Sequence, residues 1–230
     1  MLRIDAQPAP RKFTELRAAR APYSKFSSEP SIRRRLWEQQ GGRCAYCERK
    51  LRRWDHVNHR TRIEHFHPQH GLVWTATCKG QSGASDHESA PTTWKNMLLC
   101  CNGQEHLAET DLHRCDKKKD NTDVCEDFRN PRDWHGYRLV DVKRSGKAFA
   151  VSGLPHGAQN VIDSVININD PDLVKTRRNL WASLEKKVAH LYQASVADRA
   201  AVAAYLREQA KTAAFATTYL SLADRFDPSI

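Results

Sequence analysis

Two neighbouring residues near the middle of the first half of the chain, Glu64 and His65, could take part in hydrolysis of a phosphodiester bond. A neutral imidazole can take a proton from water, while a nearby carboxylate can hold a divalent cation that stabilises charge on the phosphate. Pro68 follows closely and favours a bend, so both side chains could face one site. A Glu-His pair by itself is usually an ordinary surface pair, and its meaning depends on the residues around it.

Cysteines flank this pair on both sides. Cys44 and Cys47 form a Cys-x-x-Cys pair, whose two thiolates can reach one ion from a tight turn. Cys115 and one of the adjacent residues Cys100 and Cys101 could complete a four-sulfur site. Adjacent residues of an extended segment point to opposite sides, so we expect only one of these two to bind. The spacing predicts a structural zinc site that joins residue 44 to residue 115.

Four further residues with suitable side chains have no assigned partner. His67 and His70 could contact phosphate or metal, or could lie exposed, whereas Cys78 and Cys125 are expected to be buried thiols. The odd total of seven cysteines favours ligands and free thiols over disulfides, as is usual in the cytoplasm. With no apolar leader and no apolar run of about 18 residues, we expect a cytoplasmic protein without a membrane span.

The charge of the chain favours a polyanionic partner. The net charge is 37 − 27 = +10, and residues 1–60 hold fifteen Lys or Arg against six Asp or Glu. Basic side chains that neutralise phosphates release counterions, so such a surface favours nucleic acid, although a merely solubilising surface has the same composition. The residues that we expect to contact nucleic acid are Arg33, Arg34, Arg35, Arg52, Arg53 and Lys119.

The elements that position the central residues follow from local patterns. After Pro30, apolar residues share one face of a helix over residues 31–40, and Gly41 and Gly42 end it. Residues 61–66 are rich in β-branched and aromatic side chains and predict a short strand. Residues 79–91 are small and polar and predict a surface loop.

The second half of the chain is mainly helical by pattern. The apolar run 97–99 is expected to lie in the core, and residues 137–151 predict a hairpin around Gly146. An amphipathic helix is expected from Pro171 to about residue 192, followed by a second, alanine-rich helix over about 197–226. We expect these two long helices to pack as an antiparallel pair.

These elements together predict an α+β protein that is predominantly helical. We divide the chain into a basic N-terminal arm and helix (1–42), a zinc-bound central module (43–130) and a hairpin with a C-terminal pair of long helices (131–230).

Four motifs in the central module resemble a known family. They are Cys44-Ala45-Tyr46-Cys47-Glu48, Ile63-Glu64-His65-Phe66-x-Pro68, Trp94-x-Asn96-x-Leu98-Leu99-x-Cys101 and Cys115-Asp116-x-x-Lys119. This set is similar to the zinc-bound HNH endonucleases, most closely those of the PtuB type. Proteins of that type accompany an ATPase, PtuA, in Septu anti-phage systems and in some retron systems.

The resemblance implies a ββα-metal module and a role for each matching residue. His65 would be the general base, and Asn96 would orient it through the backbone. Glu64 and Asp116 would hold a catalytic divalent ion, magnesium or manganese. Cys101, rather than Cys100, would bind the structural zinc with the other three cysteines.

Our main hypothesis is therefore a metal-dependent HNH endonuclease that cleaves DNA together with a PtuA-type ATPase. An RNase, for example one directed at tRNA, could use the same site, because the mechanism requires no 2′-hydroxyl group. A zinc-stabilised subunit that binds nucleic acid without cleaving it is the alternative from another functional class, and it would need only the cysteines.

Overall fold

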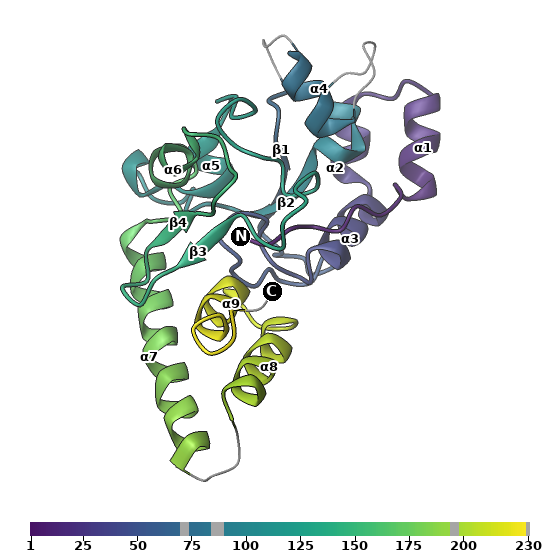
Figure 1. Ribbon diagram of the computed structural model, residues 1–230. Helices are drawn as coiled ribbons and strands as arrows, with labels where there is room; N and C mark the ends of the chain where they lie inside the picture. Colours follow the sequence, from purple (N-terminus) through teal and green to yellow (C-terminus); the bar gives the residue numbers. More distant parts are fainter. Residues whose placement is uncertain (70–73, 84–89, 194–197, 229–230) are drawn as a thin grey trace.

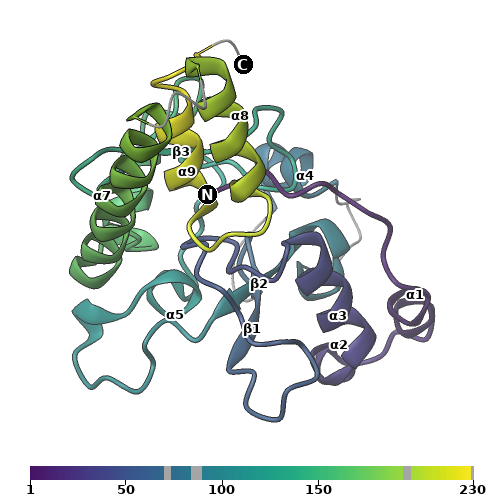
Figure 2. The same cartoon turned by 90° about the horizontal axis from the view of Figure 1, so that it is seen from below.

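The computed structural model describes residues 1–69, 74–83, 90–193 and 198–228, which form an α+β fold of helices around two small antiparallel sheets (Figures 1 and 2). The helices are α1 (Arg11–Ala18), α2 (Tyr23–Ser28), α3 (Pro30–Gln39), α4 (Ala76–Ser82), α5 (Cys115–Lys119), α6 (Ala158–Asn160), α7 (Pro171–Gln193), α8 (Arg199–Ala210) and α9 (Ala216–Ala223). The strands are β1 (Thr61–His65), β2 (Met97–Cys101), β3 (Val140–Val142) and β4 (Ala148–Ala150). Shorter helical turns are η1 (Ala90–Thr92), η2 (Trp94–Asn96), η3 (Thr110–Leu112) and η4 (Val161–Val165).

The first sheet pairs β1 with β2 in antiparallel register, from Thr61 opposite Cys101 to His65 opposite Met97. All five side chains of β2 are buried, which confirms that residues 97–99 belong to the core. Helix α5 follows after the segment 102–114 and packs against β2. The order of the elements around the central residues is thus strand, strand and short helix.

Helix α3 and its end agree with the prediction. Ile32 and Leu36 are buried on its inner face, and the chain then turns through Gly41 and Gly42 with positive φ angles of 57° and 66°. A Cβ atom at residue 42 would lie 2.7 Å from the ring of Trp37, so only glycine fits this turn without displacing the tryptophan. The turn leads the chain directly into the first cysteine pair.

The prediction of a surface loop over residues 79–91 is wrong for its first part, because α4 extends to Ser82. The Thr75 side chain caps this helix by accepting a hydrogen bond from the Cys78 N–H group. The polar side chain of Gln81 is buried and donates to the carbonyl oxygens of Cys125 and Phe128, at 2.6 and 3.2 Å. The polar composition that indicated a loop instead serves these internal contacts. Residues 84–89 lie outside the described part of the chain.

The predicted C-terminal pair of long helices is also corrected. Helix α7 forms as expected, but the alanine-rich segment divides into α8 and α9, which lie side by side next to α7 in both views (Figures 1 and 2). Helix α8 ends at Ala210, and α9 begins after Phe215, whose φ angle of 53° is left-handed and whose N–H group donates to the Glu48 carbonyl oxygen at 3.1 Å. The Glu48 carboxylate then accepts from the N–H group of Thr217 in the first turn of α9. The contact with residue 48, distant in sequence, therefore fixes the start of α9, while the last carbonyl oxygen of α8, on Ala210, accepts from Arg43 at 3.1 Å.

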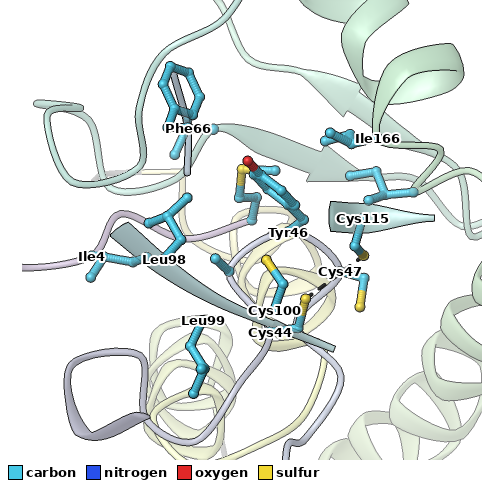
Figure 3. Close-up of a cluster of buried hydrophobic side chains, with 14 of the residues drawn as sticks. Ile4, Cys44, Tyr46, Cys47, Phe66, Leu98, Leu99, Cys100, Cys115 and Ile166 are labelled. Atoms are coloured by element: carbon cyan, nitrogen blue, oxygen red, sulfur yellow. Dashed lines mark hydrogen bonds between the residues drawn. The ribbon is translucent and has the colours of Figure 1, made fainter. Parts of the chain in front are cut away.

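One large hydrophobic core joins the three regions into which we divided the sequence. It includes Ile4 from the N-terminal region, Leu98 from the central module and Ile166 from the C-terminal region (Figure 3). A second cluster lies between α7, α8, α9 and β3, and Trp181 and Leu206 are among its buried members. Of the helices formed by described residues, none combines the length and apolar character needed to cross a membrane.

Candidate active site and metal centre

The four predicted zinc ligands meet in one buried group, which we call the four-cysteine cluster. Cys44 and Cys47 come from the turn after α3, Cys101 ends β2, and Cys115 begins α5. The ligand atoms all lie within 4.8 Å of one another, and Figure 3 shows the sulfurs of Cys44 and Cys115 facing each other. The fourth sulfur comes from Cys101, while Cys100 is outside the cluster, as the alternating strand geometry requires.

The sulfur spacing in the four-cysteine cluster is that of a zinc site. The Sγ atoms of Cys44 and Cys115 are 3.8 Å apart, as are those of Cys47 and Cys101. Zinc–sulfur bonds of about 2.3 Å in a tetrahedron place the sulfurs roughly 3.8 Å apart, whereas a disulfide needs about 2.05 Å. Hydrogen bonds from the other three thiols lower the pKa of Cys47. Burial raises the pKa of Cys100 to about 12, so this neighbouring thiol stays neutral.

Glu64, His65 and Asp116 line one cavity of about 420 Å³, beside β1 and the start of α5. Tyr23 and Arg62 also line it. The two carboxyl groups come from adjacent elements, because Glu64 lies on β1 and Asp116 directly follows the cysteine that begins α5. The four-cysteine cluster and the cavity are therefore positioned by the same short helix.

Glu64 is a buried carboxylate with two strong local partners. The Tyr46 hydroxyl donates to its Oε1 atom at 2.9 Å, and the Lys119 Nζ atom lies 3.0 Å from the same oxygen. Burial alone would raise its pKa, but the Lys119 charge and hydrogen bonds from Asp116, Lys119 and Tyr46 together lower the pKa of Glu64 below its ordinary value. Glu64 is thus ionised inside the protein.

Asp116 has the opposite behaviour. Burial, a hydrogen bond to Glu64 and the charge of Glu64 raise its pKa to about 8, against weaker opposing effects of Arg62 and Lys119. Two carboxyl groups held this close share a proton unless a cation lies between them. Oxygen donors of this kind are the ligands that magnesium and manganese prefer, so the pair fits a divalent ion.

His65 is held at the end of β1 by the backbone around it. The side chain of Asn96 accepts from the N–H group of His67 at 2.7 Å and donates to the His67 carbonyl oxygen at 2.8 Å. The carbonyl oxygen of Asn96 also accepts from the N–H group of Phe66 at 2.9 Å. Three hydrogen bonds therefore fix the two residues that follow His65, and Lys119 adds a fourth to the His65 carbonyl oxygen at 3.0 Å.

The imidazole of His65 lies between polar and aromatic neighbours. Its Nδ1 atom is 2.7 Å from Nε2 of Gln69, and its Nε2 atom is 3.4 Å from the carbonyl oxygen of Pro91. The ring of Tyr23 meets it edge-on, with 5.1 Å between centroids. With the Gln69 amide donating, Nδ1 is the unprotonated nitrogen of the ring.

The basic residues predicted to contact nucleic acid differ in whether their side chains are exposed or engaged in contacts within the protein. Arg34 and Arg53 are exposed, and their guanidinium carbons lie 5.7 and 6.0 Å from the centroid of the Trp54 ring. Arg33 is half-buried and donates to the carbonyl and hydroxyl oxygens of Thr61 at 3.0 and 2.7 Å. The first two side chains are accessible to a polyanion, although each also pairs with a nearby carboxylate, while Arg33 supports β1.

The remaining predicted contacts differ in the same way. Arg52 is exposed, and Arg35 donates to the side chain of Gln7 at 3.1 Å. Lys119 is fully buried, instead of lying on the surface, because its ammonium group pairs with Glu64. A phosphate could reach Lys119 only if that ion pair opened. The pairing was not evident from the sequence, where Lys119 was one of three consecutive lysines.

His67, Cys78 and Cys125, which had no assigned role, lie together with Asp123 in a second group of possible metal ligands. His70 lies outside the described residues.

Known proteins do not supply an identification: no family model matches the sequence, and no curated protein is significantly similar to it.

Proposed function

We propose that this protein is a metal-dependent endonuclease of the HNH type that hydrolyses DNA phosphodiester bonds. The observation that supports it most is that Glu64, His65 and Asp116 line one cavity, next to the four-cysteine cluster that ends at Cys115. The order of β1, β2 and α5 around that cavity is compatible with the ββα-metal arrangement of this class. Resemblance of the four sequence motifs to HNH endonucleases supports the same assignment.

In the proposed reaction His65 takes a proton from the attacking water. The lone pair on Nδ1 that accepts from Gln69 is the one that would serve as the base once substrate fills the cavity. Asn96 acts through the backbone, since its side chain fixes His67 and so limits how the imidazole can move. A divalent ion held by Glu64 and Asp116 would supply positive charge to stabilise the phosphate and the leaving oxygen.

The charge distribution supports a nucleic-acid substrate. Arg34 and Arg53 present guanidinium groups beside Trp54, an arrangement that can bind phosphates and stack on a base. Resemblance to PtuB-type proteins extends the proposal to anti-phage defence with a PtuA-type ATPase. In that case the C-terminal helices α7, α8 and α9 would offer the docking surface for the ATPase.

The test is cleavage of supercoiled plasmid by wild type and His65→Ala, each with magnesium, manganese or EDTA, and with and without the ATPase. His106→Ala is the matched control, because His106 is exposed and does not line the cavity. We expect metal-dependent nicking that is lost in His65→Ala and kept in His106→Ala. Matched single-stranded DNA and RNA substrates distinguish a DNase from an RNase.

Equal cleavage by wild type and His65→Ala would refute the assignment of the base. Absence of cleavage of any substrate, with zinc still bound and nucleic acid still retained, would identify a binding subunit instead.

A further inference from the structure

A second group of side chains that could bind a metal ion is separate from the four-cysteine cluster. It consists of His67, Cys78, Asp123 and Cys125, and we call it the mixed cluster. One ligand atom from each residue lies within 4.8 Å of the ligand atoms of the other three. His67, Cys78 and Cys125 are fully buried, and the side chain of Asp123 is 27% exposed. Both thiols are free.

The distances in the mixed cluster are those of a tetrahedron around one ion. His67 Nδ1 lies 3.8 Å from Cys125 Sγ and 3.2 Å from Asp123 Oδ2, and Cys78 Sγ lies 3.6 Å from Asp123 Oδ2. Bonds of about 2.3 Å to sulfur and about 2.0–2.2 Å to nitrogen or oxygen place unlike ligand atoms roughly 3.4–3.6 Å apart. These three distances lie within about 0.3 Å of the tetrahedral values, so small shifts of the side chains would fit an ion.

Surrounding residues hold the donors in this arrangement. The Trp74 ring stacks on the His67 imidazole with 4.2 Å between centroids and 26° between planes. The Cys125 N–H group donates to Asp123 Oδ1 at 2.9 Å, and Gln81 donates to the Cys125 carbonyl oxygen. Asp123 is thereby oriented through one oxygen while the other faces the cluster. Such support around the ligands is typical of metal sites.

The imidazole of His67 indicates how an ion would bind. Its Nε2 atom is buried and has no hydrogen-bond partner among the residues that the structure describes, whereas Nδ1 faces Asp123 and Cys125. Burying a polar ring with one nitrogen unsatisfied costs about 1–3 kcal/mol, which a strong bond at the other nitrogen can offset. Coordination through Nδ1 would place the remaining proton on Nε2.

We propose that the mixed cluster is a second, structural zinc site, separate from the four-cysteine cluster. Two thiolates, an imidazole and a carboxylate form a donor set that suits zinc, and four protein ligands leave no open position for catalysis. Of the four side chains, that of Asp123 is the one in contact with solvent.

The position of this site suggests what it does. It ties residue 67, two positions after His65, to α4 through Cys78 and to the segment after α5 through Cys125. The backbone of His67 is already fixed from another direction by Asn96. A metal at this point would anchor the segment next to His65, whether or not the protein proves to be a nuclease.

Metal content and ligand type test the proposal on the intact protein, after incubation with zinc and desalting. The measurements are zinc per chain by elemental analysis and the zinc X-ray absorption spectrum. The four-cysteine cluster alone gives one ion with four sulfurs. Both sites give two ions with six sulfurs between them, an average of three sulfurs per ion, and this is the expected result. Zinc held by Glu64 and Asp116 would instead give an average of two.

Single-residue variants show which side chains bind the second ion. Cys78→Ala is expected to retain one ion per chain with four sulfurs, while Cys100→Ala retains both, because Cys100 belongs to neither cluster. Glu64→Gln should also retain both. One ion with four sulfurs in wild type would overturn the proposal, as would a disulfide between Cys78 and Cys125 in the protein as purified. Should Cys78→Ala fail to fold, the wild-type measurements still decide.

Discussion

Lys119 offers the sharpest test of how the cavity is built. Its ammonium group is fully buried, lies 3.0 Å from Glu64 Oε1 and donates to the His65 carbonyl oxygen at 3.0 Å. Methionine has a similar length but no charge, so Lys119→Met leaves the Glu64 carboxylate buried beside Asp116 without its cation. We expect the pKa of Glu64 to rise and the folded state to lose stability.

The expected loss of stability is large because both side chains of the ion pair are buried: Lys119 is 0% exposed and Glu64 is 4% exposed. Removing one partner of a buried pair costs about 3–5 kcal/mol, because the other charge stays desolvated. Removing both costs less. We therefore expect Glu64→Gln/Lys119→Met to be more stable than Lys119→Met, with a coupling of about 1–3 kcal/mol between the two sites.

The assay is urea unfolding of protein that has been loaded with zinc and then desalted, in buffer without any free divalent cation, so that no free cation replaces the ammonium group. Lys118→Met is the control, because Lys118 lies on the same helix but pairs at 3.4 Å with a fully exposed Asp111. Such a surface pair contributes less than about 1 kcal/mol. A loss in Lys119→Met no larger than in Lys118→Met would refute the reasoning, as would a double variant that gains nothing.

Three further predictions concern the parts around this pair. Cys44→Ala should lose the zinc of the four-cysteine cluster and with it the folded central module, whereas Cys100→Ala should keep both. Circular dichroism and metal content distinguish the two variants, and a folded, zinc-free Cys44→Ala protein would contradict the prediction. Asn96→Ala should destabilise the protein by about 2–6 kcal/mol in urea unfolding, because the buried N–H and carbonyl groups of His67 lose their partners. A loss under about 1 kcal/mol would count against the role of Asn96 in fixing the His67 backbone. Manganese affinity should rise about tenfold per pH unit up to about pH 8 and then level off, because the ion must displace the proton that Asp116 holds. Calorimetry measures this affinity, and a value that does not change with pH would exclude Asp116 as a ligand.

Much of the fold could be predicted where the signal is local. The helix before Gly41 and Gly42, the strand at residues 61–65 and the hairpin around Gly146 each have their own sequence pattern, and the structure confirms them. The break between α8 and α9 has no such pattern, because its hydrogen bonds come from residues far away in sequence. The Ala210 carbonyl oxygen accepts from Arg43, and Phe215 donates to Glu48, 167 positions earlier. Long-range contacts of this kind override local helix propensity.

The candidate site, like the fold, could be predicted only where its residues lie close together in the sequence. Cys44 and Cys47 are three positions apart and signal a metal site directly, so the four-cysteine cluster could be predicted. The mixed cluster draws single residues from positions 67 to 125 and contains no close cysteine pair, so only the folded chain brings them together. Lys119 was placed on the surface for a related reason, since composition cannot show which of three adjacent lysines faces inward.

Both clusters bear on one physical problem, which is how a sheet of two five-residue strands can hold the side chains that line the cavity rigidly. So small a sheet supplies few backbone hydrogen bonds and little apolar burial of its own. Here Glu64 is fixed from one side through Lys119, on the helix that begins at Cys115 of the four-cysteine cluster. The segment after His65 is fixed from the other side through Asn96 and the mixed cluster. Placing adjacent residues between two anchored segments gives them a precision that the short strands alone could not provide, and it explains why so many chemically specialised side chains gather around residues 64–67.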